Sequence, residues 1–356
     1  MKSGKLIVSL LVLAALIGLG IYAYYHVPFS FANFKSQLAM TDWTKIAIGL
    51  GCIYLGYVFR AVRWALLLRP NKKIPLFSLL GTQVIGFSSV ALVGRVADLA
   101  RPYLVAKKTG LPLSTQVAVY IVERLFDAGA MALIFSSVIL LAPADSIPHA
   151  EMVRKVGYWG LAGTVAGALF LVLVRLAGGA VATFFEKIFG VLSKSLGHAA
   201  GEKIREFRTG LDTLRTFGDL VITLTLSLAM WGLITVAYLE TVRAFVASPQ
   251  LANMTLGQCM VLEIASGGAS ALQLPVIGWF TQIGAVAAVL SGFFGAAPEP
   301  ATACAAMLLI VTFLGIIPVG LIWAQFENVS LRRVAKESEQ AGEAVIEAQA
   351  EEPAQS

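Results

Sequence analysis

Long apolar segments constrain this chain more than any other feature of its sequence. A helix needs about 20 predominantly apolar residues to cross the hydrocarbon core of a bilayer, and segments of that length recur along the chain. Those that we interpret as full crossings are residues 6–25, 46–68, 114–142, 157–176, 219–243 and 300–323. The sequence therefore predicts an all-α polytopic membrane protein.

The composition excludes the main soluble alternatives. Hydrophobic residues make up 58% of the 356 residues and charged residues only 13%, with a mean hydropathy of +0.79. A soluble domain carries about 25% charged residues, so this chain has too few to cover a water-facing surface. An ordinary soluble enzyme, a disordered chain and a nucleic-acid-binding protein are therefore excluded. Only three cysteines are present, which argues against a disulfide scaffold or a thiolate metal centre.

The first apolar segment, residues 6–25, resembles a membrane anchor more than a signal peptide. It follows Lys2 and Lys5 and ends in Tyr-Ala-Tyr-Tyr. A cleaved signal peptide has a shorter apolar region and small residues before its cleavage site. We therefore expect this segment to be retained as the first transmembrane helix.

Basic residues suggest how the segments are threaded through the membrane. Cytoplasmic loops carry an excess of Lys and Arg, and the regions 69–73, 95–108 and 177–215 are all basic. If these regions and both termini are cytoplasmic, the apolar segments 76–93 and 256–295 must each return to the face they enter from. We therefore expect about six full transmembrane helices plus two opposed re-entrant, broken helical hairpins. If both segments crossed fully instead, the basic region 95–108 would lie outside the cell, against the tendency of basic loops to be cytoplasmic.

Three regions of the chain are expected to differ in organisation. Residues 1–330 form the transmembrane domain, and residues 331–356 form an acidic cytoplasmic tail that we expect to be disordered. Within the domain, residues 180–215 combine aromatic and aliphatic residues at helical spacing with several basic residues. This pattern predicts an amphipathic helix at the cytoplasmic membrane surface. A helix that covers the bundle with the same apolar face is the alternative.

Charged residues inside the apolar segments are the strongest functional signal. Glu123 lies nine residues beyond Ser114, which places it about 13 Å along the helix, and Asp127 follows on the same face. Each such charge costs at least about 2.5–3.5 kcal/mol in lipid, so these residues should face a polar interior. Arg60 and Arg63 approach from the same side, one turn apart. The group could hold a lipid phosphate, since guanidinium groups bind phosphate well, or it could be an ion-pair cluster that only joins helices.

Three motifs in residues 60–130 resemble one known family of membrane proteins. They are RAVRW from Arg60 to Trp64, GRVADLARPYLVAKKTG from Gly94 to Gly110, and VERLFD from Val122 to Asp127. In this order and spacing they resemble the transmembrane region of the lysylphosphatidylglycerol synthases, a family of flippase-like integral membrane proteins. The likeness covers nearly all of residues 1–330. We expect a stand-alone member without the soluble synthase domain.

The resemblance also implies which residues meet a lipid headgroup. The matched motif positions are Arg60, Arg63, Arg95, Asp98, Arg101, Glu123, Arg124 and Asp127, and a later Pro/Gly-rich motif, LPVIGWFTQIG, adds Pro275, Gly278 and Gln282. The family pattern usually has an acid where Gln282 stands. We expect these residues to line one polar cavity within the membrane.

The resemblance implies lipid translocation between the leaflets of a bacterial cytoplasmic membrane. The lipid would be an anionic or amino phospholipid, a hopanoid or a polyprenyl lipid. A lipid-binding accessory or scaffold for a lipid-biosynthetic enzyme is the first alternative. A membrane enzyme that acts on a lipid-linked phosphate is the second. We find no nucleotide-binding, metalloprotease or serine-hydrolase motif, and we expect no enzymatic activity and no cofactor.

The second hairpin suggests a mechanism. We expect Gly267-Gly268 and the region from Pro275 to Gly284 to break its helices inside the bilayer. Helix ends exposed in this way attract anions through free N–H groups and the helix dipole. A phosphate could then pass between these ends and the arginines. The alternative is that the glycines only allow tight helix packing.

Overall fold

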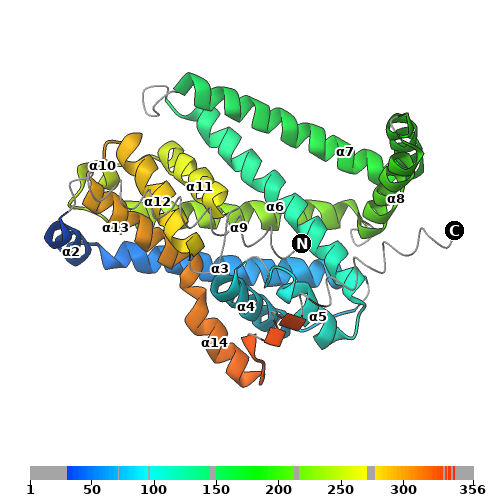
Figure 1. Cartoon of the computed structure of the whole chain (residues 1–356), viewed down its shortest axis with the longest axis horizontal. Coiled ribbons are helices and arrows are strands. Elements are labelled where there is room, and N and C mark those ends of the chain that lie inside the picture. The colour runs from blue at the N-terminus through cyan, green and yellow to red at the C-terminus, as the bar shows by residue number, and fades with distance from the viewer. Residues whose placement is uncertain are drawn as a thin grey trace.

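The computed structural model describes residues 30–70, 72–94, 97–143, 150–191, 193–211, 216–270, 277–331, 333–334, 336–337 and 340. In this part of the chain the regular structure is entirely helical, which confirms the expected all-α class (Figure 1). The helices are α2 (Phe31–Ala39), α3 (Trp43–Leu68), α4 (Leu76–Val93), α5 (Ala100–Thr109), α6 (Leu113–Leu141), α7 (Ala150–Gly190), α8 (Lys194–Leu211), α9 (Phe217–Arg243), α10 (Pro249–Ala252), α11 (Leu256–Ser270), α12 (Ile277–Gly292), α13 (Pro298–Leu309), a π-helical turn η3 (Ile310–Leu314) and α14 (Ile316–Phe326).

Six helices of the described part are long and apolar enough to cross a membrane. They are Trp43–Leu68, Leu76–Val93, Thr115–Leu141, Glu151–Gly190, Phe217–Arg243 and the continuous helical stretch Pro298–Phe326. Five of them contain or closely match the crossings expected from the sequence. The sixth, Leu76–Val93, was expected to be re-entrant, and the expected first crossing, residues 6–25, lies outside the described residues.

The antiparallel helices α3 and α9 form the centre of the bundle (Figure 1). With 26 and 27 residues, each is about 40 Å long, more than the hydrocarbon thickness of a bilayer. Asp42 caps α3 by accepting from Thr44 N at 3.0 Å, and Thr216 forms a capping box with Asp219 at the start of α9. These caps define where each helix begins.

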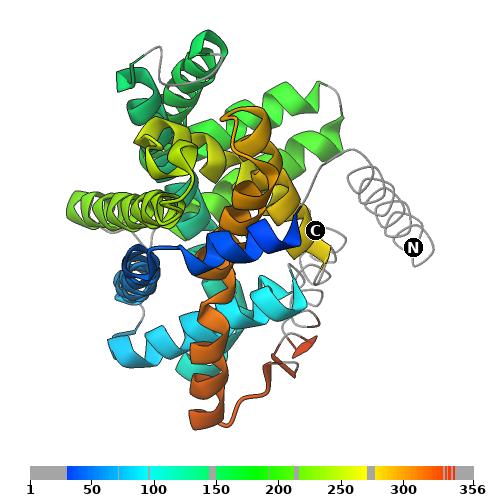
Figure 2. The same cartoon turned by 90° about the vertical axis from the view of Figure 1, so that its left-hand side faces the viewer.

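One end of the bundle is formed by short connections. Asp42 N donates to the carbonyl of Ala244 at 2.8 Å, and Ser30 N donates to Glu299 Oε1 at 2.9 Å. The first bond places the start of α3 beside the end of α9, and the second places the start of α2 beside the start of α13. Figure 2 looks at the molecule from this end, which also carries α2 and α10.

The first hairpin exists, but its turn lies elsewhere than expected. Residues 76–93 do not break and return; α4 is one unbroken helix, and α5 makes the return. Lys108 Nζ donates to the carbonyl of Ser78 at 3.3 Å, and Lys72 Nζ donates to the carbonyl of Thr109 at 2.7 Å. The start of α4 and the end of α5 are therefore at one level. The sequence predicted a surface loop over residues 95–108. Instead α5 forms this second arm, because its apolar residues Ala100, Leu104 and Val105 are buried in clusters that include side chains of α4.

The second hairpin pairs α11 with α12. Gln282 Nε2 donates to Ser266 Oγ at 2.6 Å across the pair. The expected break at Gly267-Gly268 is wrong, since α11 continues to Ser270. Two glycines cost a helix only about 1 kcal/mol each, which neighbouring helices can offset. A β-carbon at either glycine would have open space around it, so tight packing does not explain them either.

The described part of residues 180–215 belongs to two helices, α7 and α8, rather than to one amphipathic helix. The first part continues the preceding crossing as α7, which changes direction at Ala177. Then α8 folds back antiparallel along the second half of α7, with Arg205 Nη2 donating to Glu186 Oε1 at 2.8 Å. Gly197 and Gly201 allow this close approach, because a side chain at either would overlap atoms of α7.

The packed body extends beyond residue 330. Leu331 and Val334 are buried against Ala97, Ala100 and Leu104 of the first hairpin. Glu337 accepts from Tyr103 Oη at 2.8 Å, on the same hairpin. The start of the acidic tail is therefore helical and held against α5, while residues 341–356 lie outside the described part.

Candidate functional site

Four arginines and two carboxylates from three helices converge in the interior; we call them the arginine cluster. Its members are Arg60 and Arg63 of α3, Arg101 of α5, and Glu123, Arg124 and Asp127 of α6. Helical spacing explains the convergence, because residues three or four apart share one face. The sequence predicted that the α6 charges share a site with Arg60 or Arg63, and ion pairs join Glu123 and Asp127 to both arginines.

Arg63 holds the two acids together. Its Nη2 lies 2.7 Å from Glu123 Oε1, and its Nη1 lies 2.6 Å from Asp127 Oδ1. Nη1 also donates to Ser227 Oγ of α9 at 2.6 Å. The side chain is only 1% exposed. Arg63 thereby joins α3, α6 and α9 through both terminal nitrogens, while its buried Nε has no hydrogen-bond partner among the described residues.

Arg101 belongs to α5, the second arm of the first hairpin. Its Nη1 lies 3.1 Å from Glu123 Oε2 and also donates to Gln83 Oε1 of α4 at 3.1 Å. Its guanidinium carbon lies 4.4 Å from the ring centre of Phe87 and 5.4 Å from that of Trp64. Cation–π contacts of this kind stabilise a guanidinium group away from water. The guanidinium group of Arg101 is thus bound by a carboxylate, an amide oxygen and aromatic rings of the protein.

Arg60 and Arg124 are bound much less completely. Arg60 Nη1 lies 3.7 Å from Asp127 and 3.9 Å from Glu123, and it has no hydrogen-bond partner among the described residues. Arg124 Nη2 is 2.9 Å from Asp127 Oδ2, but its Nε has no partner in the same part of the chain, and its side chain is 40% exposed. These two guanidinium groups have donors to offer a ligand.

The cluster carries more positive than negative charge. Four guanidinium groups face two carboxylates within the cluster, and Asp98 interacts electrostatically with Arg124, so an excess of one positive charge remains among these described groups. An uncompensated buried charge is costly. A bound anion would reduce that cost, and a phosphate would match the planar donors of Arg60 and Arg124.

Of the remaining predicted site residues that the structure describes, only Asp98 has a recorded interaction with the cluster. Arg95 and Pro275 lie outside the described residues. Asp98, in the turn before α5, is close enough to influence Arg124 electrostatically. Gly278 and Gln282 belong to α12, where Gln282 contacts Ser266 of the second hairpin. The structure therefore does not join the Pro/Gly-rich motif to the arginines through any described contact.

Several partners of the cluster were not predicted from the sequence. Gln83 and Ser227 supply oxygen atoms to Arg101 and Arg63, and Phe87 and Tyr120 stack near the guanidinium groups. Polar residues inside apolar segments were a usable signal for Gln83 and Ser227. The aromatic residues gave no such signal, because aromatic residues are common in transmembrane segments.

No group of three or more His, Cys, Asp or Glu side chains suited to a metal ion occurs in the described part of the chain. The cluster's chemistry is that of guanidinium and carboxylate groups, with aromatic rings around them. This arrangement can bind an anion and orient it.

Comparisons with known proteins identify the family. The model of the lysylphosphatidylglycerol synthase TM region matches residues 6–320. Neither the curated proteins nor the solved structures contain a match. The matched range includes the whole arginine cluster and both hairpins. The chain therefore belongs to the lysylphosphatidylglycerol synthase transmembrane-region family.

Proposed function

We propose that this protein translocates a phosphate-bearing lipid between the leaflets of a bacterial cytoplasmic membrane, without chemical conversion of the lipid. The arginine cluster binds the headgroup phosphate while the acyl chains stay in the bilayer. The main barrier to flipping is exposure of the charged headgroup to hydrocarbon, and a polar site inside the bundle lowers that barrier. The family's link to lipid metabolism supports this proposal.

The observation that carries the proposal is the incomplete binding of Arg60 and Arg124 within a site of excess positive charge. A purely structural ion-pair network would be expected to balance its charges and satisfy its donors. Arg63 and Arg101 are almost fully buried and make close ion pairs, at 2.6–2.7 Å and 3.1 Å, although Arg63 Nε also has no hydrogen-bond partner among the described residues. Arg60 makes no ion pair shorter than 3.7 Å, and the Arg124 side chain is 40% exposed, so we assign these two to the phosphate and the other two to positioning.

A phosphate site favours some of the expected lipids over others. An anionic phospholipid, an amino phospholipid and a polyprenyl phosphate all present the required group, whereas a hopanoid does so only if its headgroup carries phosphate. The basic end of the bundle, with Lys72, Lys107 and Lys108, suits contact with the cytoplasmic leaflet. We propose that both termini lie on that side.

The test is a leaflet-resolved assay with purified protein in liposomes. Headgroup-labelled phospholipid in the outer leaflet should become protected from an impermeant quencher faster than in protein-free liposomes. Product formation by the protein alone would favour a membrane enzyme. Capture of a lipid-biosynthetic enzyme without any lipid movement would favour an accessory role, and either result would contradict the proposal.

A further inference from the structure

A second buried acidic site lies apart from the arginine cluster, on the second hairpin. Glu263 of α11 is only 5% exposed, and Thr235 Oγ1 of α9 donates to its Oε2 at 3.1 Å. No described Lys, Arg or His makes an ion pair with it, unlike Glu123 and Asp127. Glu263 is therefore an acid within an apolar segment that lacks a cation in the described structure.

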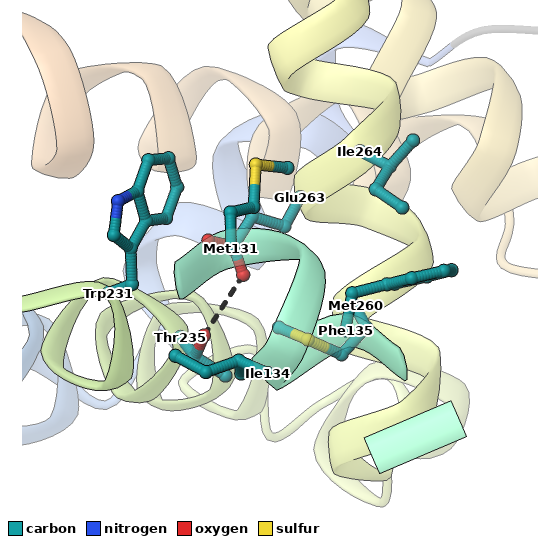
Figure 3. A pocket seen from close by; sticks show the side chains of 8 residues that line it. All are labelled: Met131, Ile134, Phe135, Trp231, Thr235, Met260, Glu263 and Ile264. Atoms are coloured by element: carbon teal, nitrogen blue, oxygen red, sulfur yellow. Dashed lines mark hydrogen bonds between the residues drawn. The ribbon is translucent and has the colours of Figure 1, made fainter. Parts of the chain in front are cut away.

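The surroundings of Glu263 are strongly apolar. A small cavity of about 10 Å³ touches it, with room for about one water molecule. The lining is drawn in Figure 3 and comes from three helices: Met131, Ile134 and Phe135 of α6, Trp231 and Thr235 of α9, and Met260, Glu263 and Ile264 of α11. The indole N–H of Trp231 is buried and has no hydrogen-bond partner among the described residues.

These surroundings favour a neutral carboxyl group. A carboxylate in an apolar site without a cation loses its hydration and gains little in return, whereas the protonated acid loses far less. One donated hydrogen bond from Thr235 does not replace the several that water gives a carboxylate. The site is therefore built to hold a proton on Glu263.

The other ionisable groups around Glu263 do not supply a positive charge. Tyr238 of α9 and Cys259 of α11 are close enough to interact with it electrostatically, and both are neutral in their ordinary forms. From α6 the cavity is lined by apolar side chains only. The α12 sequence contains no ionisable side chain. Asp127, the nearest acid along α6, is paired with Arg63 and Arg124.

The site shares two helices with the arginine cluster. On α9, Trp231 and Thr235 lie one and two turns beyond Ser227, which accepts from Arg63. On α6, Met131 and Phe135 lie one and two turns beyond Asp127. These spacings correspond to about 6 and 12 Å along each helix. A change of charge on Glu263 would act on the cluster through a low-dielectric interior.

We propose that Glu263 is a proton-binding site within the membrane, loaded through the adjacent cavity, and that its charge state influences the arginine cluster. The proton site rests on its own geometry and stands whether or not the protein moves lipid. It would give this chain a means of responding to pH or to a proton gradient.

Infrared difference spectroscopy on the purified full-length protein in nanodiscs tests the proton site directly. At neutral pH, wild type minus Glu263→Gln should show the carbonyl band of a protonated carboxylic acid, and raising the pH should convert it to carboxylate bands. Glu151→Gln is the control: this α7 side chain is 87% exposed, so its removal should cost carboxylate bands only. Loss of carboxylate bands alone with Glu263→Gln at neutral pH would overturn the proposal.

A second variant keeps the test decisive if Glu263→Gln does not fold. Thr235→Val retains Glu263 but removes its hydrogen-bond donor. The carbonyl band of the protonated acid should then move toward that of an acid free of hydrogen bonds. An unchanged carboxylic acid region in this variant would show that Glu263 is not the protonated group and would contradict the assignment.

Discussion

Arg101 lies directly against Gly86, so that the methylene groups of the arginine occupy the space where a side chain on α4 would begin. The contact joins the two arms of the first hairpin at the level where Arg101 reaches Glu123. A small residue on one arm thus determines where a charged residue on the other can lie. The hairpin is the element that delivers Arg101 to the cluster.

Gly86→Val should therefore disturb the cluster without removing any charge. The added side chain overlaps Arg101, and over-packing of this kind costs about 1–3 kcal/mol. We expect a lower unfolding temperature and a clearly slower lipid translocation rate in liposomes. Gly129→Ala on α6 is the control, since nothing lies near its β-carbon. Equal translocation by Gly86→Val and wild type would show that the position of Arg101 is unimportant.

Arg63 and Arg60 should differ sharply in their contribution to stability. Arg63→Gln leaves Glu123 and Asp127 without their closest partner, and breaking a buried ion pair costs about 3–5 kcal/mol. Arg60→Gln removes only the ion pairs at 3.7 and 3.9 Å, so it should cost much less. Thermal unfolding of both variants in the same detergent measures the difference. Similar losses would contradict the division between positioning and ligand-binding arginines.

The two ends of the first hairpin should be accessible from one side of the membrane. Lys72 contacts the carbonyl of Thr109, and Lys107 lies two residues earlier on α5. In a background with the native cysteines replaced, Lys72→Cys and Lys107→Cys should react with an impermeant maleimide from the same side. Lys35→Cys, on α2 at the other end, should react from the opposite side. Labelling of Lys72→Cys and Lys107→Cys from different sides would rule out the hairpin.

The contact between the C-terminal segment and α5 should depend on pH. The hydrogen bond from Tyr103, together with the nearby Lys107, holds the pKa of Glu337 below its usual range. A lowered pKa means that the folded contact favours the ionised form of Glu337. The contact therefore contributes fully to stability above about pH 4.3, the ordinary pKa of a Glu side chain, and this contribution is lost as pH falls through the lowered value. Amide protection factors of the segment around Val334, which correct for the intrinsic pH dependence of exchange, should fall in the wild type as pH is lowered below about 4. Glu337→Gln should remove most of that pH dependence.

The crossings were predictable because hydrophobicity and length alone determine them. Residues 46–68, 114–142 and 219–243 correspond closely to α3, α6 and α9. The intramembrane charges were also a reliable signal, because Glu123 and Asp127 would be energetically costly unless they face the interior of the bundle. Convergence of these acids with Arg60 and Arg63 followed from helical spacing.

The turn positions were not predictable in the same way. Glycines at 267 and 268 suggested a break, but the surrounding packing keeps α11 helical through them. The second arm of the first hairpin, α5, contains Arg101, Lys107 and Lys108. Such charges are typical of a surface loop, so the sequence did not indicate that α5 packs within the bundle. Glu263 was missed because it belongs to no matched motif, and its lack of a cation emerges only from the packing of α6, α9 and α11.

Lipid movement by a double variant in liposomes tests whether Arg60 and Arg124 bind the phosphate of a translocated lipid. Arg60→Gln with Arg124→Gln should be reconstituted in liposomes beside wild type and beside Lys155→Gln, a variant of an exposed basic residue of α7. After equal folding is confirmed by thermal unfolding, the rate of headgroup-labelled phospholipid movement is measured. We predict a fall of about tenfold or more for the double variant, corresponding to about 1.4 kcal/mol of lost phosphate interaction, and no change for Lys155→Gln. A folded double variant that moves lipid at the wild-type rate would contradict the claim.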